Sequence, residues 1–188
     1  MTVTIPKKYS FEEYRSHSIN RDIKCEFVNG YLVEMPPASG LHADILDFLQ
    51  DVFKQEIQKT HRDWFVRPGT IGVRTGVQKS RIPDLVIITN AQLQGLRNLP
   101  SAILEEPPML VVEIVSPGNP EEDYRYKRSE YAALQIPEYW IFDAIASKIT
   151  VLEWVEGLYE PREFQGSEKL ESPTFEGLDL TSDRIFSQ

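Results

Sequence analysis

Two acidic side chains lie in stretches of sequence that are otherwise apolar. Asp84 opens the run Leu85–Ile88, and Glu113 lies inside Met109–Val115. A carboxylate in such surroundings is unfavourable unless it is paired, protonated or bound to a cation. If the two runs form neighbouring strands, both carboxylates can converge, and two oxygen ligands with water completing the shell are what Mg²⁺ prefers. The pair therefore predicts a divalent metal site, although Asp84 alone could also be an exposed strand end or a cap on a backbone amide.

A lysine in the next predicted helix supplies a third group. In the stretch Glu121–Gln135, Asp123, Lys127 and Tyr131 recur every four residues and share one helix face. An ammonium beside two metal-binding carboxylates would orient the attacking water and offset phosphate charge. Two structural alternatives stay open. Asp123 and Lys127 could form an ordinary surface pair, or Lys127 or Arg81 could simply neutralise a buried acid.

Hydrophobic periodicity predicts the elements that must position these groups. The clearest helix covers about residues 41–59, where apolar residues recur at three- and four-residue spacing. Ser10 and Glu13 have capping-box spacing, and Asn29-Gly30 is a strong hairpin signal. Further helices are expected at residues 93–99 and 121–135, and one more short element is expected around Phe186. Strands are expected at residues 24–28, 31–35, 64–67, 71–74, 82–88, 109–115, 139–143, 149–155 and 159–164. This order predicts a central mixed β-sheet flanked by helices.

Size and composition limit the class of protein. A chain of 188 residues with 41% hydrophobic residues supports one domain, predicted over residues 1–188. Cys25 is the single cysteine, which excludes an internal disulfide and fits a reducing compartment. No apolar run follows Lys7 and Lys8 as a signal peptide would need, and none approaches the roughly 18 residues that span a bilayer. A cytoplasmic protein without a membrane partner is expected.

Charge is distributed unevenly along the chain. The net charge of −9 argues against a uniformly basic surface for nucleic acid. Between residues 62 and 81, however, only Asp63 opposes a group of cations, and this predicts a local positive zone. The cations are Arg62, Arg67, Arg74, Lys79 and Arg81.

The residues that carry chemistry belong to an ordered set that resembles a known family. The set comprises Arg81–Ile88, Pro107-Pro108 leading to Val112–Pro117, Lys127 with Tyr131, and Glu138–Asp143, with Cys25–Gly30 and His42 upstream. Over about residues 8–186 it resembles the Uma-two family, a group inferred to be restriction endonucleases within the PD-(D/E)xK nuclease superfamily. The resemblance implies a restriction-endonuclease-like α/β fold and a metal-dependent endonuclease that hydrolyses phosphodiester bonds in DNA.

The resemblance also implies a set of site residues. Mg²⁺ or Mn²⁺ would be held by Asp84, Glu113 and the Ile114 carbonyl, with Lys127 as the catalytic lysine. The superfamily motif places its lysine two residues after the second acid, where this chain has Val115. Resemblance to the Uma-two family implies that Lys127 replaces it from the following helix, within reach because a lysine side chain is long and flexible.

Three further residues match family positions. Glu26 could add a carboxylate to the metal shell, or it could be a surface residue of the hairpin. His42 could approach a phosphate or a water, although a lone histidine more often serves as a structural hydrogen-bonding group. Tyr131 is expected to support the site or the core.

The predicted partner is DNA, with phosphate contacts from Arg67, Arg74, Lys79 and Arg81. A homodimer is a further hypothesis, since paired nicks need two sites. Two other functions stay open: a non-catalytic binding or regulatory module with a nuclease fold, suggested by Val115 and the acidic net charge, and a purely structural domain.

Overall fold

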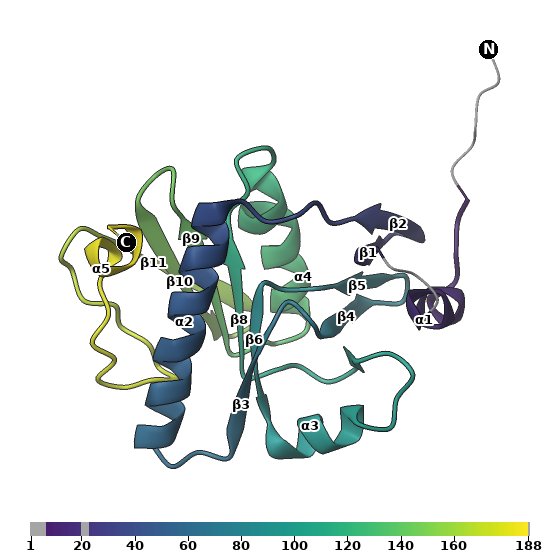
Figure 1. Ribbon diagram of the computed structural model, residues 1–188, viewed down its shortest axis with the longest axis horizontal. Coiled ribbons are helices and arrows are strands. Elements are labelled where there is room, and N and C mark those ends of the chain that lie inside the picture. The colour runs from purple at the N-terminus through teal and green to yellow at the C-terminus, as the bar shows by residue number, and fades with distance from the viewer. Residues whose placement is uncertain (1–6, 20–22, 188) are drawn as a thin grey trace.

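The computed structural model describes residues 7–19 and 23–187 and contains two β-sheets. Parts of two predictions, the domain over residues 1–188 and the absence of a signal peptide, fall on residues 1–6, 20–22 and 188, which lie outside the described residues. The prediction of a mixed sheet flanked by helices is confirmed, except that the strands divide between two sheets instead of one (Figure 1).

The larger sheet has six strands in the order β11-β10-β9-β8-β6-β3. Its strands are β3 (Trp64–Pro68), β6 (Leu85–Thr89), β8 (Leu110–Ile114), β9 (Glu138–Asp143), β10 (Lys148–Val155) and β11 (Leu158–Gln165). Strand β8 runs antiparallel to β6 and parallel to β9. All five β8 residues are buried, so this mostly apolar strand is covered on both faces of the sheet.

The smaller sheet has five strands in the order β2-β1-β5-β4-β7. They are β1 (Cys25–Val28), β2 (Tyr31–Glu34), β4 (Gly72–Gly76), β5 (Lys79–Arg81) and β7 (Ile103–Leu104). The hairpin between β1 and β2 turns at Asn29 and Gly30, with φ of 53° and 89°. Positive φ at both positions is the type I′ geometry that the Asn-Gly pair predicts.

Helices cover the sheets in the pattern that their apolar stripes require. Helix α2 (Gly40–Lys59) crosses one face of the six-stranded sheet (Figure 1) and buries Ile45, Leu49, Phe53 and Ile57 against it. The π-helical segment η1 (Glu122–Lys127) continues into α4 (Arg128–Ala133), which contributes Tyr131 to a second hydrophobic core.

The remaining helices are short. Helix α1 (Phe11–Ile19) begins after the predicted Ser10–Glu13 capping box and packs Phe11 and Tyr14 on Phe27. Helices α3 (Asn90–Leu96) and α5 (Ser182–Phe186) lie at the other two predicted positions. None of the described helices is long and apolar enough to cross a bilayer.

Several predicted boundaries were wrong. Helix α3 begins three residues before the predicted start because Thr89 and Gln92 form a capping box there. Strand β5 lies in the polar stretch between the predicted strands at residues 71–74 and 82–88, where no strand was predicted, and the strand predicted to begin at residue 82 begins at Leu85. The helix predicted over residues 121–135 starts as a π-helix.

Candidate active site

The predicted site residues meet where the two sheets join. The chain leaves the five-stranded sheet at Arg81, crosses through Ile82 and Pro83, and enters the six-stranded sheet just after Asp84. The Ile82 amide donates to Glu26 Oε1 of strand β1 at 3.0 Å, which ties the crossing segment to the smaller sheet. This crossing explains the Pro83-Asp84 pair, since proline suits a segment that makes no ladder hydrogen bond.

Asp84 is held by groups from both sides of the site. Its Oδ2 accepts a hydrogen bond from the Ile114 amide at 2.7 Å, and its Oδ1 lies 3.1 Å from Nε2 of His42. Burial would raise the pKa of Asp84, but the hydrogen bond and charge of His42 and the Ile114 amide hold it below its usual value. Asp84 therefore stays ionised, with its side chain 14% exposed. His42 lies in the first turn of α2, where Ser39 accepts its amide as N-cap.

Glu113 is almost completely buried and receives two donors. Lys127 Nζ lies 2.8 Å from Glu113 Oε2, and the Tyr131 hydroxyl donates to Oε1 at 2.7 Å. The ammonium also lies 2.9 Å from Asp123 Oδ1, so one lysine bridges two carboxylates. The surface-pair alternative for Asp123 and Lys127 is therefore wrong, because the two residues are only 4% and 7% exposed.

The electrostatics of this group show an excess of negative charge. Burial raises the pKa of Glu113 to about 8 against the opposing charge of Lys127, and the carboxylates of Asp84, Asp123 and Glu26 add to the rise. Burial would lower the pKa of Lys127, but Glu113 and Asp123 hold it well above its usual value. Lys127 is therefore a fixed positive charge at neutral pH. Because Arg81 binds Glu26, one ammonium is left among the carboxyl groups of Asp84, Glu113 and Asp123. A divalent cation bound there would favour the ionised form of Glu113 and lower its pKa.

Arg81 does not neutralise Asp84 or Glu113. It is 2% exposed and binds three other acids: Glu26 at 2.9 Å, Glu122 at 2.7 Å and Glu130 at 2.8 Å. Glu26, 6% exposed, has both oxygens occupied by the Arg81 guanidinium and the Ile82 amide, so the alternative of a hairpin surface residue is wrong. These contacts fasten strand β5 to β1 and to the η1–α4 helix.

The predicted phosphate-contacting residues separate into two groups. Lys79 and Arg81 both bind Glu130, and Arg74 binds Glu105 at 2.9 Å, so these cations are already paired with carboxylates. We exclude Arg81 from the candidate nucleic-acid-binding residues because its guanidinium reaches no solvent. Arg67, by contrast, is half-buried and donates a hydrogen bond to the Val66 carbonyl.

Sequence reasoning missed two contributors to this region. Asp123 shares the Lys127 ammonium with Glu113, and Glu130 collects Arg81, Lys79 and the Thr75 hydroxyl. The four-residue spacing from Asp123 to Lys127 placed them on one face, but their burial depends on how η1 packs. The role of Glu130 could not be predicted, because its partners Lys79 and Arg81 lie in strand β5, which the sequence pattern did not indicate.

The donor set fits a hard divalent cation in type. Asp84 and Glu113 present carboxylate oxygens from adjacent strands, and Leu85 pairs with Val112, so the two acids occupy neighbouring positions in the register. Across residues 7–19 and 23–187, no three His, Cys, Asp or Glu side chains form a ready cage for a metal ion. Mg²⁺ keeps several waters and needs only one or two protein carboxylates, so Asp84 and Glu113 suffice. Ile114 follows Glu113 in β8, and its amide donates a hydrogen bond to Asp84, so the Ile114 backbone lies beside both acids.

An α/β fold with paired strand acids and a neighbouring lysine defines the restriction-endonuclease-like nucleases, and similarity to known proteins agrees. The crystal structure of a "putative nuclease belonging to DUF820" from Anabaena variabilis has a TM-score of 0.73 and 18% sequence identity, covering 89% of this chain and 92% of that one. At that identity the likeness shows the fold. No curated protein matches the sequence.

The Uma2 family profile, described as "Putative restriction endonuclease", matches residues 11–183. The chain therefore belongs to the Uma2 family, which confirms the Uma-two resemblance and places the protein among the restriction-endonuclease-like nucleases.

Proposed function

We propose that the protein is a Mg²⁺- or Mn²⁺-dependent endonuclease that hydrolyses phosphodiester bonds in DNA. The observation that carries this proposal is the convergence of Asp84, Glu113 and Lys127 at the junction of the two sheets, with direct contact between Glu113 and Lys127. Membership of the Uma2 family supports the nuclease class. The carboxylate pair supports metal dependence, and the family resemblance supports DNA as the substrate.

Each residue has a distinct role in this proposal. Asp84 and Glu113 would hold the ion, with the Ile114 carbonyl as a further candidate ligand, whereas Glu26 is engaged by Arg81 and the Ile82 amide. A bound divalent ion polarises the phosphoryl group, activates water and stabilises the leaving oxygen. Lys127 is protonated, so it offsets phosphate charge and orients the attacking water; it does not accept a proton. Tyr131 fixes the orientation of Glu113 through its hydroxyl.

A plasmid-cleavage assay tests the proposal. We expect wild-type protein to nick or linearise supercoiled DNA with Mg²⁺ or Mn²⁺ but not with EDTA. Asp84→Asn should abolish cleavage, and Lys127→Met should reduce it at least 100-fold, of the order expected when a preorganised charge is lost. Asp179→Asn is the matched control, because Asp179 is 71% exposed on the C-terminal segment. Cleavage that survives Asp84→Asn at the wild-type rate would contradict the site.

A second function rests on one specific observation. Val115 occupies the position of the superfamily lysine and is part of the second hydrophobic core, 6% exposed. If Lys127 cannot serve in place of that lysine, the protein would be a nucleic-acid-binding or regulatory module with a nuclease fold. Calorimetric titration with Mn²⁺ separates the two functions: heat of binding together with absent cleavage favours the module.

A further inference from the structure

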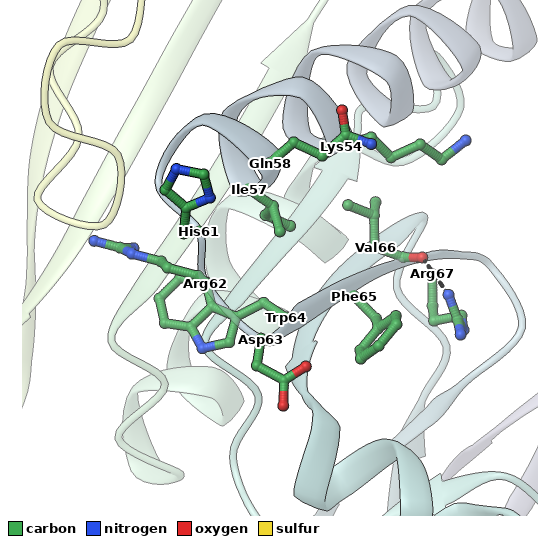
Figure 2. A pocket seen from close by; sticks show the side chains of 10 residues that line it. All are labelled: Lys54, Ile57, Gln58, His61, Arg62, Asp63, Trp64, Phe65, Val66 and Arg67. Atoms are coloured by element: carbon green, nitrogen blue, oxygen red, sulfur yellow. Dashed lines mark hydrogen bonds between the residues drawn. The ribbon is translucent and has the colours of Figure 1, made fainter.

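A groove of about 650 Å³ lies between the end of α2 and strand β3. Helix α2 contributes Lys54, Ile57 and Gln58 to its wall, and residues 61–67 complete the lining. Figure 2 shows Arg62 and Arg67 at opposite ends of the strand segment, with Trp64 and Phe65 between them. Strand β3 is an edge strand that pairs only with β6 in the described part of the chain.

The Arg67 end of the groove lies next to the backbone that carries Asp84. Strand β3 ends at Pro68 opposite Leu85, and the next amide, that of Gly69, donates to the Asp84 carbonyl at 2.8 Å. Helix α2 begins at the same site, since His42 in its first turn contacts Asp84. The five residues of β3 span roughly 16 Å at the usual rise of a strand. A ligand lying along β3 would therefore reach from His61 toward Asp84.

The charge of the groove is opposite to that of the whole protein. Its lining has three cations, Lys54, Arg62 and Arg67, against the single anion Asp63, whereas the chain has a net charge of −9. Lys54 also pairs with Asp51 of the same helix at 3.5 Å, with both side chains exposed. Among the described residues, neither arginine forms an ion pair with a carboxylate. Arg62 donates a hydrogen bond to the Thr174 carbonyl, and Arg67 donates one to the Val66 carbonyl. Both guanidinium groups therefore keep their charge available to an anion.

Each of these arginines lies on an aromatic ring. The Arg62 guanidinium is 4.3 Å from the centre of the Trp64 ring, and that of Arg67 is 5.4 Å from the centre of the Phe65 ring. Both rings are half-buried and so retain exposed surface. Cations that follow a backbone beside aromatic platforms are the means by which proteins bind single-stranded nucleic acid without reading its sequence. An acidic peptide would use the cations but not the rings.

We propose that this groove binds a single-stranded segment of nucleic acid that flanks the scissile phosphate, and that it leads the strand to Asp84. The inference rests on the proposed nuclease function and adds to it the path and the form of the substrate. Arg62, Arg67 and Lys54 contact phosphates, and Trp64 stacks on a base. Arg67 is the predicted phosphate contact that this groove retains.

Fluorescence anisotropy in EDTA tests the groove without cleavage, using a 12-nucleotide oligothymidylate labelled with fluorescein. We expect Lys54→Glu/Arg67→Glu to raise the Kd at least 10-fold and to reduce the slope of log K against log salt by about 1.4, which is about 0.7 for each lost phosphate contact on a single strand. The control Arg162→Glu/Lys169→Glu makes the same charge change at residues 54% and 72% exposed, and should change the Kd less than 2-fold. Equal Kd values for the two double variants would overturn the proposal.

Intrinsic fluorescence reports the aromatic contact. Oligothymidylate should quench the wild-type tryptophan emission, and Trp64→Phe should remove that quench. Trp154→Phe should keep it, because Trp154 packs against the second core and donates to the Ala132 carbonyl. A quench that persists in Trp64→Phe contradicts the stacking role. Circular dichroism of each variant verifies that it is folded.

Two competitors define the ligand class. A blunt 12-base-pair duplex should bind about 10-fold more weakly than the single strand, and polyglutamate should not displace the strand at equal charge concentration. Equal duplex affinity, or full displacement by polyglutamate, would overturn the assignment to single strands. Failure of the groove is distinguishable from failure of the nuclease function, because Asp84-dependent plasmid cleavage is measured separately with metal present.

Discussion

Lys127 Nζ lies 2.8 Å from Glu113 Oε2 although Lys127 comes from the helix that follows strand β8, fourteen positions after the glutamate. The position two residues after Glu113 is Val115, whose side chain belongs to the hydrophobic core. The lysine that contacts the second acid therefore comes from a different element of the tertiary structure and not from the same strand. The π-helical segment η1 ends at Lys127 and carries Asp123, which holds the other side of the ammonium.

Removal of this ammonium should destabilise the protein. Lys127→Met keeps the length of the side chain but leaves Glu113 and Asp123 buried without their shared cation. We expect the free energy of unfolding to fall by about 1–3 kcal/mol, because the buried carboxyl groups of Glu113 and Asp123 lose their shared hydrogen-bond donor. Urea denaturation at pH 7 measures the change. Adding Glu113→Gln to Lys127→Met should restore part of the loss, whereas strictly additive effects would contradict a direct interaction.

Removing the Tyr131 hydroxyl should show whether Tyr131 supports the candidate active site or only packs in the hydrophobic core. Tyr131→Phe removes the hydrogen bond to Glu113 Oε1, and the expected cost is about 1–3 kcal/mol of stability. Tyr159→Phe is the control, since its buried hydroxyl donates to the Ile136 carbonyl away from the acids. Both variants should lose similar stability, but only Tyr131→Phe should reduce plasmid cleavage. Equal cleavage by the two would make Tyr131 a core residue alone.

His42 should tune metal binding through Asp84. Its Nε2 lies 3.1 Å from Asp84 Oδ1, and residues that orient a ligand in this way typically contribute 10–100-fold to metal affinity. His42→Ala should therefore raise the Kd for Mn²⁺ by about that factor in calorimetry. His61→Ala, at the far end of α2, should leave the Kd unchanged. An unaltered Kd in His42→Ala would mean that His42 has only a structural role in the first turn of α2.

The sequence predicted the site better than its surroundings. Asp84 and Glu113 could be found because carboxylates in apolar runs need a partner, and the run around Glu113 is buried on both faces as expected. Strand β5 could not be found, because three polar residues carry no apolar alternation even where Ser80 and Arg81 are buried. The π-helix was also hidden, since residues 121–135 fit an ordinary helical period. For that reason the burial of Asp123 was not foreseen.

The ion pairs of Glu130 should make the protein sensitive to acid. Burial would raise the pKa of Glu130, but its hydrogen bonds from Arg81, Lys79 and Thr75 lower it from 4.5 to about 2. A carboxyl whose folded pKa is depressed stabilises the protein fully above its unfolded pKa, because between the two values the unfolded state binds more protons. This stabilisation is therefore present at pH 7 and is lost as pH falls from about 4.5 toward 2.

Glu130→Gln tests this dependence. At pH 7 the variant should lose about 3 kcal/mol or more of stability, because Arg81 keeps its buried charge without its main partner. Between pH 5 and pH 3 its urea midpoint should fall less steeply than that of the wild type, since the group that titrates has been removed. Glu160→Gln, at an exposed position on β11, should follow the wild-type curve. If Glu130→Gln and wild type lose stability in parallel between pH 5 and pH 3, the acid sensitivity arises from other carboxylates. Glu130 would then not titrate in this window.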